Sequence, residues 1–280
     1  MKLANIVPVA HLKTLIDESE RYHLVIADMI VGNTTYRNHY LDCVERGDSV
    51  IIDSLAFERP EGSNPGTLLS AWAALYSVMP SGKNTLEIVL PDRMDDPGES
   101  ARMTREGLNI LRGEIWPLVP LTDRRPAFQV VPHGKTWREY LFYARDLAQL
   151  SDVSVVGIQE EIDDLFGIRR EEAVRSLQLV IGGKQWHLNG VREDLEDIRS
   201  EWMRKNVRST DTGKFVTWGL NMQAVRPDTK PVPTYPGRKK FGGSIGYFAF
   251  CSTNPSALGM ARNNMAAWRE FLACAASSEQ

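Results

Sequence analysis

Short runs of apolar, β-branched residues alternate along the chain with stretches whose apolar positions recur at helical spacing. The runs are typical of buried strands, and the amphipathic stretches are typical of helices that cover a sheet. The predicted strands are 22–31, 49–57, 85–92, 126–134, 152–159, 185–190 and 207–213, with 244–250 as a candidate eighth. The predicted helices are 36–45, 68–79, 99–111, 191–205, 255–273 and one that begins after Thr136, where Glu139 completes a capping-box spacing.

Strands that alternate with helices predict a parallel sheet. Seven or eight such units favour a (β/α)8 TIM-like barrel over an open doubly wound sheet, and the 280 residues exceed the about 250 that one barrel takes. No glycine-rich nucleotide-binding motif follows any predicted strand. We therefore expect a single domain over residues 1–280, in which 222–250 is an irregular basic loop region and 255–273 a C-terminal helix.

Composition narrows the class of protein. The chain is 42% hydrophobic and carries a formal net charge of −3, so any contact with nucleic acid must come from a local basic face. Cys43, Cys251 and Cys274 are far apart and form no CxxC pair, which suggests neither a disulfide framework nor a zinc cluster. We expect no metal and no cofactor. The first residues lack the apolar region of a signal peptide, and no run reaches the length of a membrane span, so a soluble, cytoplasmic protein is expected.

Most of the predicted strands end in polar residues. In a parallel barrel the carboxyl ends of the strands open on one face, where barrel enzymes keep their chemistry. These residues would therefore converge on one pocket and surround a small polar ligand. They are Asp53 with Ser54, Asp92, His133, Gln159, Asn189 and Asp211.

Each of these residues also has a plainer interpretation. Asp92 and His133 could cap helices or form turns, and Asn189 with Gly190 is an ordinary turn dipeptide. Asp53 differs because it interrupts an apolar run, and a buried carboxylate usually has a partner or a task. Asp211 has Arg208 close in sequence, so a structural ion pair is an alternative. The prediction rests on the whole set.

Two further features bear on a ligand. Phe57 follows Asp53 by four residues and could stack on a flat ligand, or it could pack between barrel and helix. Basic residues gather late in the chain, where they could follow a phosphate backbone or form a solvated face. The basic residues are Arg204, Lys205, Arg208, Lys214, Arg238, Lys239 and Lys240.

The ordered series of segments from about residue 22 to 215 resembles the tRNA-guanine transglycosylases, and more closely the related 7-deazaguanine DNA transglycosylases of phage and bacteria. The family's Asp-Ser-x-x-Phe segment corresponds to 53–57, and its base-reading aspartate corresponds to Asp92. Its next strand ends correspond to 131–134, 156–158 and 187–190, and its nucleophilic aspartate to Asp211. The zinc subdomain of the tRNA enzymes has no counterpart here, because Cys251 and Cys274 stand alone.

The resemblance implies exchange of guanine in DNA for a free 7-deazaguanine base, with tRNA as the alternative substrate. Asp211 would be the nucleophile, and Asp53 the general acid and base. The implied base-binding residues are Ser54, Phe57, Asp92, His133, Gly157, Ile158, His187, Leu188, Asn189 and Gly190. Arg208, Lys214, Arg238, Lys239 and Lys240 would contact the nucleic acid. The location would be the cytoplasm, that of the host if the gene belongs to a phage.

Two other classes of protein remain open. A barrel hydrolase or lyase could use the same carboxylates on a free nucleoside or sugar, with water as the acceptor. A barrel that only binds nucleic acid would need none of the carboxylates for chemistry. The first would release a base without an added 7-deazaguanine, and the second would form no covalent adduct.

Overall fold

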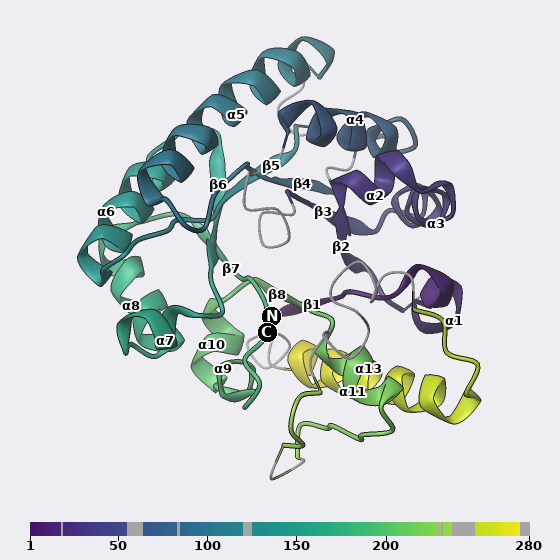
Figure 1. The fold of residues 1–280 in the computed structure, drawn as a ribbon. Helices are drawn as coiled ribbons and strands as arrows, with labels where there is room; N and C mark the ends of the chain where they lie inside the picture. The colour runs from purple at the N-terminus through teal and green to yellow at the C-terminus, as the bar shows by residue number, and fades with distance from the viewer. Residues whose placement is uncertain are drawn as a thin grey trace. The chain divides into compact units, whose positions relative to one another are not determined.

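The structure is a computed structural model that describes residues 1–17, 19–54, 64–82, 85–119, 125–228, 230, 232–236 and 250–274. Its strands belong to one eight-stranded parallel sheet with the order β1-β8-β7-β6-β5-β4-β3-β2. Helices separate the strands along the chain (Figure 1), which confirms the predicted (β/α)8 TIM-like barrel. The strands are β1 (Lys2–Asn5), β2 (Tyr22–Ile26), β3 (Ser49–Asp53), β4 (Leu86–Val89), β5 (Ala127–Val130), β6 (Val153–Ile158), β7 (Gln185–Leu188) and β8 (Ser209–Thr212).

The sequence prediction misnumbered these strands. The first strand is Lys2–Asn5, whose four residues are too few to show a period, so the predicted seventh strand is β8. The run 22–31 is also wrong as one strand, because it divides into β2 and the helix α2 (Ala27–Gly32). The candidate strand 244–250 falls outside the described residues except at Phe250.

Several helices begin where a side chain satisfies a backbone N–H group that has no partner within the helix. The predicted cap is confirmed, since the Thr136 hydroxyl accepts from the N–H of Glu139 at the start of α6 (Trp137–Ala148). Asp96 does the same for α5 (Pro97–Leu118), so Asp92 is not the cap of that helix. The other helices of residues 24–187 are α3 (Thr34–Glu45), α4 (Pro65–Tyr76), α7 (Ile162–Phe166) and α8 (Arg170–Val180).

The predicted helix 191–205 is instead two short helices, α9 (Glu196–Arg199) and α10 (Glu201–Asn206). Ser200 between them has an extended ψ of 123°, and its side chain caps α10 by accepting from the N–H of Met203. A serine favours such a break because its hydroxyl can replace a helical hydrogen bond. The remaining helices are η1 (Val9–His11), α1 (Leu12–Leu15), α11 (Lys214–Leu220) and α13 (Pro255–Cys274).

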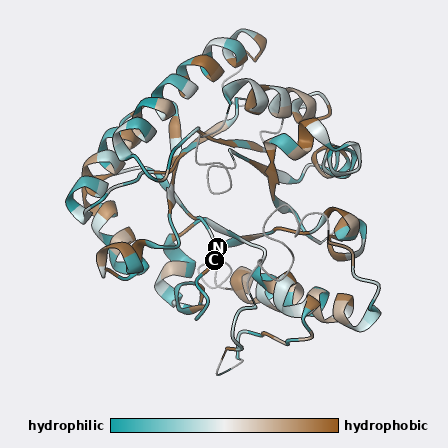
Figure 2. Ribbon diagram, viewed as in Figure 1, coloured by the Kyte–Doolittle hydropathy of each residue, from teal (hydrophilic) through white to brown (hydrophobic). Residues whose placement is uncertain are grey.

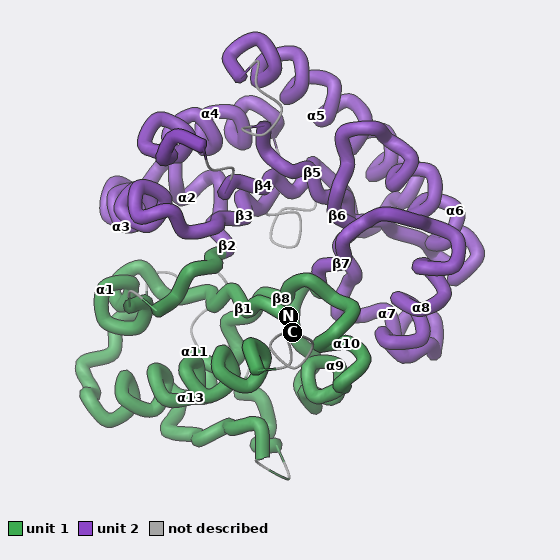
Figure 3. The backbone as a smooth tube through the Cα atoms, turned by 180° about the vertical axis from the view of Figure 1, so that it is seen from behind, with its two compact units in different colours: residues 1–23, 188–280 green, residues 24–187 purple. Residues whose placement is uncertain are grey.

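Contacts divide the chain into two compact units, residues 1–23 with 188–280, and residues 24–187 (Figure 3). Their borders fall inside β2 and at the end of β7. In residues 24–187 the inner residues of β3 and all of β4 are buried. These strands are largely hydrophobic in Figure 2, whereas α5 alternates between hydrophilic and hydrophobic residues. The prediction of a single domain stays a prediction.

In the other unit, α11 and α13 pack so closely that a side chain on Gly219 would meet Ala261, with a Cβ 2.2 Å from its Cα. Phe215 stacks on Trp268 at 5.1 Å between ring centroids. The buried Asn264 side chain donates to the carbonyl of Gln223 and accepts from the N–H of Val225. Residues 222–228 have no regular structure, and these two hydrogen bonds of Asn264 fasten residues 223–225 to α13.

A buried carboxylate in this unit links stability to pH. Burial raises the pKa of Glu20 from its ordinary 4.5 to about 7, although Arg269, at 2.7 Å, opposes the change. The folded state thus holds a proton that the unfolded chain releases above pH 4.5. The resulting stability is fully present below that pH and is lost as the pH rises through about 7.

We expect Glu20→Gln to reduce the loss of unfolding free energy between pH 5 and pH 8 by on the order of 2 kcal/mol. The measurement is urea unfolding at both pH values. Glu193→Gln, at an exposed site in the same unit, is the control. Equal pH dependence in all three proteins would contradict the assignment of this carboxyl.

Among the residues that the structure describes, no helix has the length and apolar character needed to cross a membrane.

Candidate active site

Four buried side chains form a hydrogen-bonded chain at the carboxyl ends of β3, β4, β5 and β6. The Ser54 hydroxyl donates to Asp92 Oδ1 at 3.2 Å, and Asp92 Oδ2 lies 2.6 Å from His133 Nε2. The Gln159 side chain contacts the other ring nitrogen of His133. None of the four residues is more than 6% exposed. The structure therefore brings together Ser54, Asp92 and His133, three residues predicted to bind the base.

The pattern of donors defines the chemistry of Asp92. Gln159 Nε2 faces His133 Nδ1, and in this arrangement Nδ1 accepts from the amide while Nε2 donates to Asp92 Oδ2. Asp92 then accepts one bond on each oxygen. A carboxylate has room for about four acceptor contacts. Asp92 is thus a fixed acceptor that can take further bonds from a ligand with adjacent N–H donors.

The backbone on both sides of Asp92 is fastened to α5. The Thr104 hydroxyl donates to the carbonyl of Pro91 at 2.9 Å, and the N–H of Arg93 donates to the Ser100 hydroxyl at 3.1 Å. Gly107 lies directly against Pro91, so that a Cβ there would come within 2.7 Å of the proline ring. These contacts fix the segment between β4 and α5 and hence the position of the carboxylate.

His133 and Gln159 are held by neighbouring elements. Gly134 follows His133 and lies against α6, where a Cβ would approach the Tyr140 nitrogen to 2.4 Å. The buried Arg170 of α8 donates to the carbonyl of Ile158 at 2.5 Å, directly before Gln159. Because Thr136 caps α6 and His133 contacts Asp92, the interpretation of His133 as a helix cap is wrong.

Asp53, the predicted acid and base, is the last residue of β3 and is half-buried. Burial raises the pKa of the neighbouring Tyr36 hydroxyl, and the negative charge of Asp53 raises it further. The Tyr36 oxygen also accepts from the N–H of Ile26 at 3.2 Å. Asp53 therefore lies near a hydroxyl group that stays protonated at neutral pH.

Asp211, the predicted nucleophile, forms a separate group with the segment after β7. Its Oδ1 accepts from the N–H of Gly190 at 3.2 Å. The neighbouring Thr210 hydroxyl donates to the carbonyl of Leu188 at 3.1 Å. Asp211 is 9% exposed, so the carboxylate is mostly removed from bulk water. The structure thus places Gly190, a predicted base-binding residue, beside the predicted nucleophile, and it places Leu188, another, beside the adjacent Thr210.

The other predicted residues differ in exposure. Gly157, Ile158 and His187 are buried, and Asn189 is half-buried. The predicted base contact at Phe57 and the basic residues Arg238, Lys239 and Lys240 lie outside the described residues.

Two predicted nucleic-acid contacts have structural partners. The Lys214 ammonium is buried, donates to the carbonyl of Val191 and lies 5.3 Å from the centre of the Tyr235 ring. A contact with a phosphate would require it to leave this position. Arg208 donates to the Tyr22 hydroxyl at 3.1 Å, and both residues lie at the amino-terminal end of their strands. Asp211, in contrast, lies nearer the carboxyl end of β8, so Arg208 and Asp211 lie toward opposite ends of that strand.

The predicted residue set lacks three side chains that build this region. Gln159 was expected to line the pocket as a polar strand end but was not assigned to base binding, and its contact with His133 was not predicted. Arg170 and Tyr36 belong to helices that run over the sheet, and their contacts with the strand ends are long-range features of the fold. An arginine or tyrosine within an amphipathic helix gives no separate signal.

Comparison of the sequence with protein-family models and with curated proteins found no match. The class that the structure itself defines is a parallel (β/α)8 barrel with a buried Ser-Asp-His-Gln chain at its strand ends.

Proposed function

We propose that the protein exchanges guanine in DNA for a free 7-deazaguanine base through a covalent glycosyl-enzyme intermediate. The observation that carries the proposal is the Asp92 carboxylate, which is buried and held by Ser54 and His133. Guanine and 7-deazaguanines present two adjacent donors, N1–H and the exocyclic amine. A preorganised carboxylate accepts both, and charge-assisted bonds of this kind are the stronger ones.

The two remaining carboxylates carry the proposed chemistry. Asp211 attacks C1′ of the target nucleotide, the bond from C1′ to N9 breaks, and Asp53 in its acid form protonates N9 of the departing guanine. The incoming base then gives its N9 proton to the Asp53 carboxylate. Its N9 bonds to C1′, and the ester bond to Asp211 breaks. The exchange returns Asp53 to its acid form and Asp211 to its carboxylate form without a metal or cofactor.

The neighbours of Asp211 support this role. The N–H of Gly190 donates to Asp211 Oδ1 and so limits the orientations open to the carboxylate, and Oδ2 would be the oxygen that attacks C1′. The mechanism requires Asp53 and Asp211 to reach the same nucleotide, as residues at the carboxyl ends of barrel strands do in other enzymes. The target base must leave the stack to enter, so we expect single-stranded or flipped substrate.

Transfer of labelled guanine or of a 7-deazaguanine separates the candidate functions. The protein is incubated with DNA or with tRNA in the presence of the labelled base, and the purified nucleic acid is counted and digested for nucleoside mass spectrometry. Label in DNA supports the proposal, and label only in tRNA makes the protein a tRNA-directed enzyme. Release of base without an acceptor indicates a hydrolase. Binding without label transfer or base release indicates an accessory protein.

Asp53→Asn tests the acid–base step. We expect exchange to fall by about 10²-fold or more, while the dissociation constant of the free base changes less than about threefold. The amide keeps the size of the side chain but cannot move the proton. Exchange is measured by label transfer and binding by calorimetry, with Asp42→Asn, at an exposed site of α3, as the control. Unchanged exchange in Asp53→Asn would remove this residue from the mechanism.

A further inference from the structure

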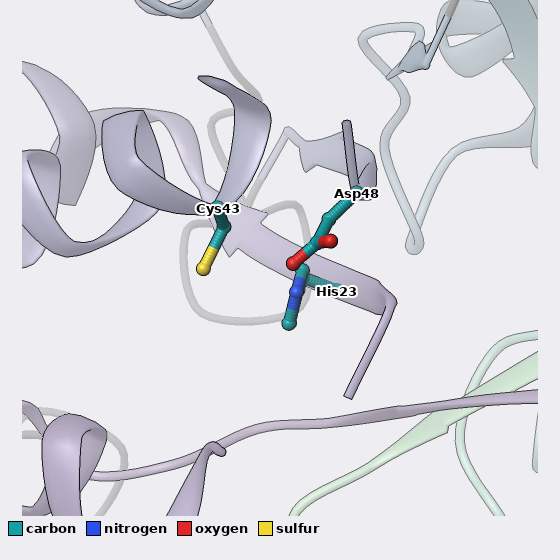
Figure 4. Close-up of side chains that lie close together, drawn as sticks. All are labelled: His23, Cys43 and Asp48. Carbon is teal, nitrogen blue, oxygen red and sulfur yellow. The ribbon is translucent and has the colours of Figure 1, made fainter. Parts of the chain in front are cut away.

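A second group of polar side chains lies beside β2 and α3. His23 of β2, Cys43 of α3 and Asp48, just before β3, converge in the close-up of Figure 4. Their possible ligand atoms, a ring nitrogen, the sulfur and a carboxylate oxygen, all lie within 4.8 Å of one another. Each residue is 1% exposed. Three chemically different groups that can bind a metal ion therefore lie close together in a buried site.

His39 is adjacent to this group, although it is not one of the three residues whose ligand atoms all lie within 4.8 Å of one another. His39 precedes Cys43 by one helical turn on α3, and its Nε2 lies 3.8 Å from the Cys43 sulfur. Residues four apart on a helix face the same side, which is how a pair of helical ligands commonly holds one ion. His39 is half-buried, so the group has a side that reaches the surface.

The local backbone fixes the positions of Cys43 and Asp48 relative to each other. The N–H of Asp48 donates to the carbonyl of Cys43 at 3.0 Å, which closes the turn between α3 and β3. Gly47, with φ of +90°, supplies the left-handed conformation that this turn needs. The distance between Cys43 and Asp48 is therefore set by the turn.

A positively charged side chain, that of Arg46, already contacts Asp48 and Cys43. The Arg46 guanidinium bonds both oxygens of Asp48 and lies 3.6 Å from the Cys43 sulfur. The arginine side chain is 30% exposed, whereas the Asp48 side chain is fully buried. A buried aspartate beside a cysteine needs positive charge, and Arg46 can turn toward solvent if an ion supplies that charge.

We propose that His23, His39, Cys43 and Asp48 bind one divalent ion of the zinc class. Two imidazoles, one thiolate and one carboxylate form a neutral set with a divalent ion, and mixed nitrogen and sulfur ligands select zinc over magnesium or calcium. With His39 joining the other three on binding, four protein ligands would complete a tetrahedron; such a site is structural and would tie α3 to β2 and to the start of β3. The inference is independent of the base-exchange proposal.

The test uses the full-length protein and zinc itself. Purified protein is stripped with a chelator, dialysed with or without zinc, and examined by elemental analysis and thermal unfolding. We expect about one zinc per chain and a higher melting temperature with zinc. Cobalt in place of zinc should give the intense absorption of tetrahedral thiolate coordination. Cys43→Ser should lose the sulfur-to-cobalt absorption, and Cys251→Ser, at an exposed cysteine, should keep it.

Arg46→Ala separates the proposal from a simple ion pair. If Arg46 alone balances Asp48, this variant loses stability and zinc changes nothing. If the group binds an ion, the variant still takes up zinc and zinc restores its stability. Absence of a zinc-dependent shift in the folded wild-type protein, or unchanged cobalt absorption in Cys43→Ser, would overturn the proposal.

Discussion

Asp211→Asn is expected to lower base exchange by at least about 10³-fold, because an amide cannot form the glycosyl ester through which the base is replaced. The fold should survive the change, since the amide oxygen can still accept from the N–H of Gly190. Label transfer into DNA measures the loss, and circular dichroism with thermal unfolding shows that the protein remains folded.

The matched control for this variant is Asp194→Asn, at an exposed aspartate of the same unit whose carboxylate pairs with Arg192. We expect it to exchange bases at the wild-type rate. Wild-type exchange in Asp211→Asn would show that another group forms the covalent bond or that none is formed.

Asp92→Asn is expected to weaken binding of the free base by about 10²-fold and to lower the free energy of unfolding by about 1–3 kcal/mol. Both effects have one cause. The amide NH2 replaces an acceptor that Ser54 and His133 use, and it also meets the base's donors with a donor. Calorimetry with a 7-deazaguanine measures the affinity, and urea unfolding measures the stability.

Asp95→Asn changes an exposed aspartate three residues further on and should alter neither quantity much, because its Arg93 pair is at the surface. A stability loss in Asp92→Asn with unchanged base affinity would make the buried chain purely structural. Unchanged affinity and stability would show that Asp92 has neither role.

The strands with long apolar runs could be predicted because burial on both faces leaves a continuous hydrophobic signal. The run that contains Val50, Ile51 and Ile52 is an example, although the strand ends at Asp53 and not at 57 as predicted. The strand Lys2–Asn5 gave no such signal, because four residues carry too little pattern. The helix Arg170–Val180 was also missed.

The sequence alone could not predict which side chains, distant along the chain, contact one another. Strand ends indicated that Asp92 and His133 would approach, but not that Gln159 would contact the same ring or that Arg170 would hold the carbonyl before it. The proposed ligands His23, Cys43 and Asp48 come from β2, from α3 and from the turn before β3, and they match no spacing motif. Because the three cysteines are far apart in the sequence, none of them indicated a metal site.

The most direct test of the base-exchange account is to identify the residue that becomes joined to DNA during turnover. The protein is mixed with DNA, denatured in acid, digested and examined by peptide mass spectrometry. The account predicts a nucleotide attached to Asp211 and consumption of that adduct when a 7-deazaguanine is added before denaturation. Attachment to another residue, or base exchange with no adduct at any time, would contradict it.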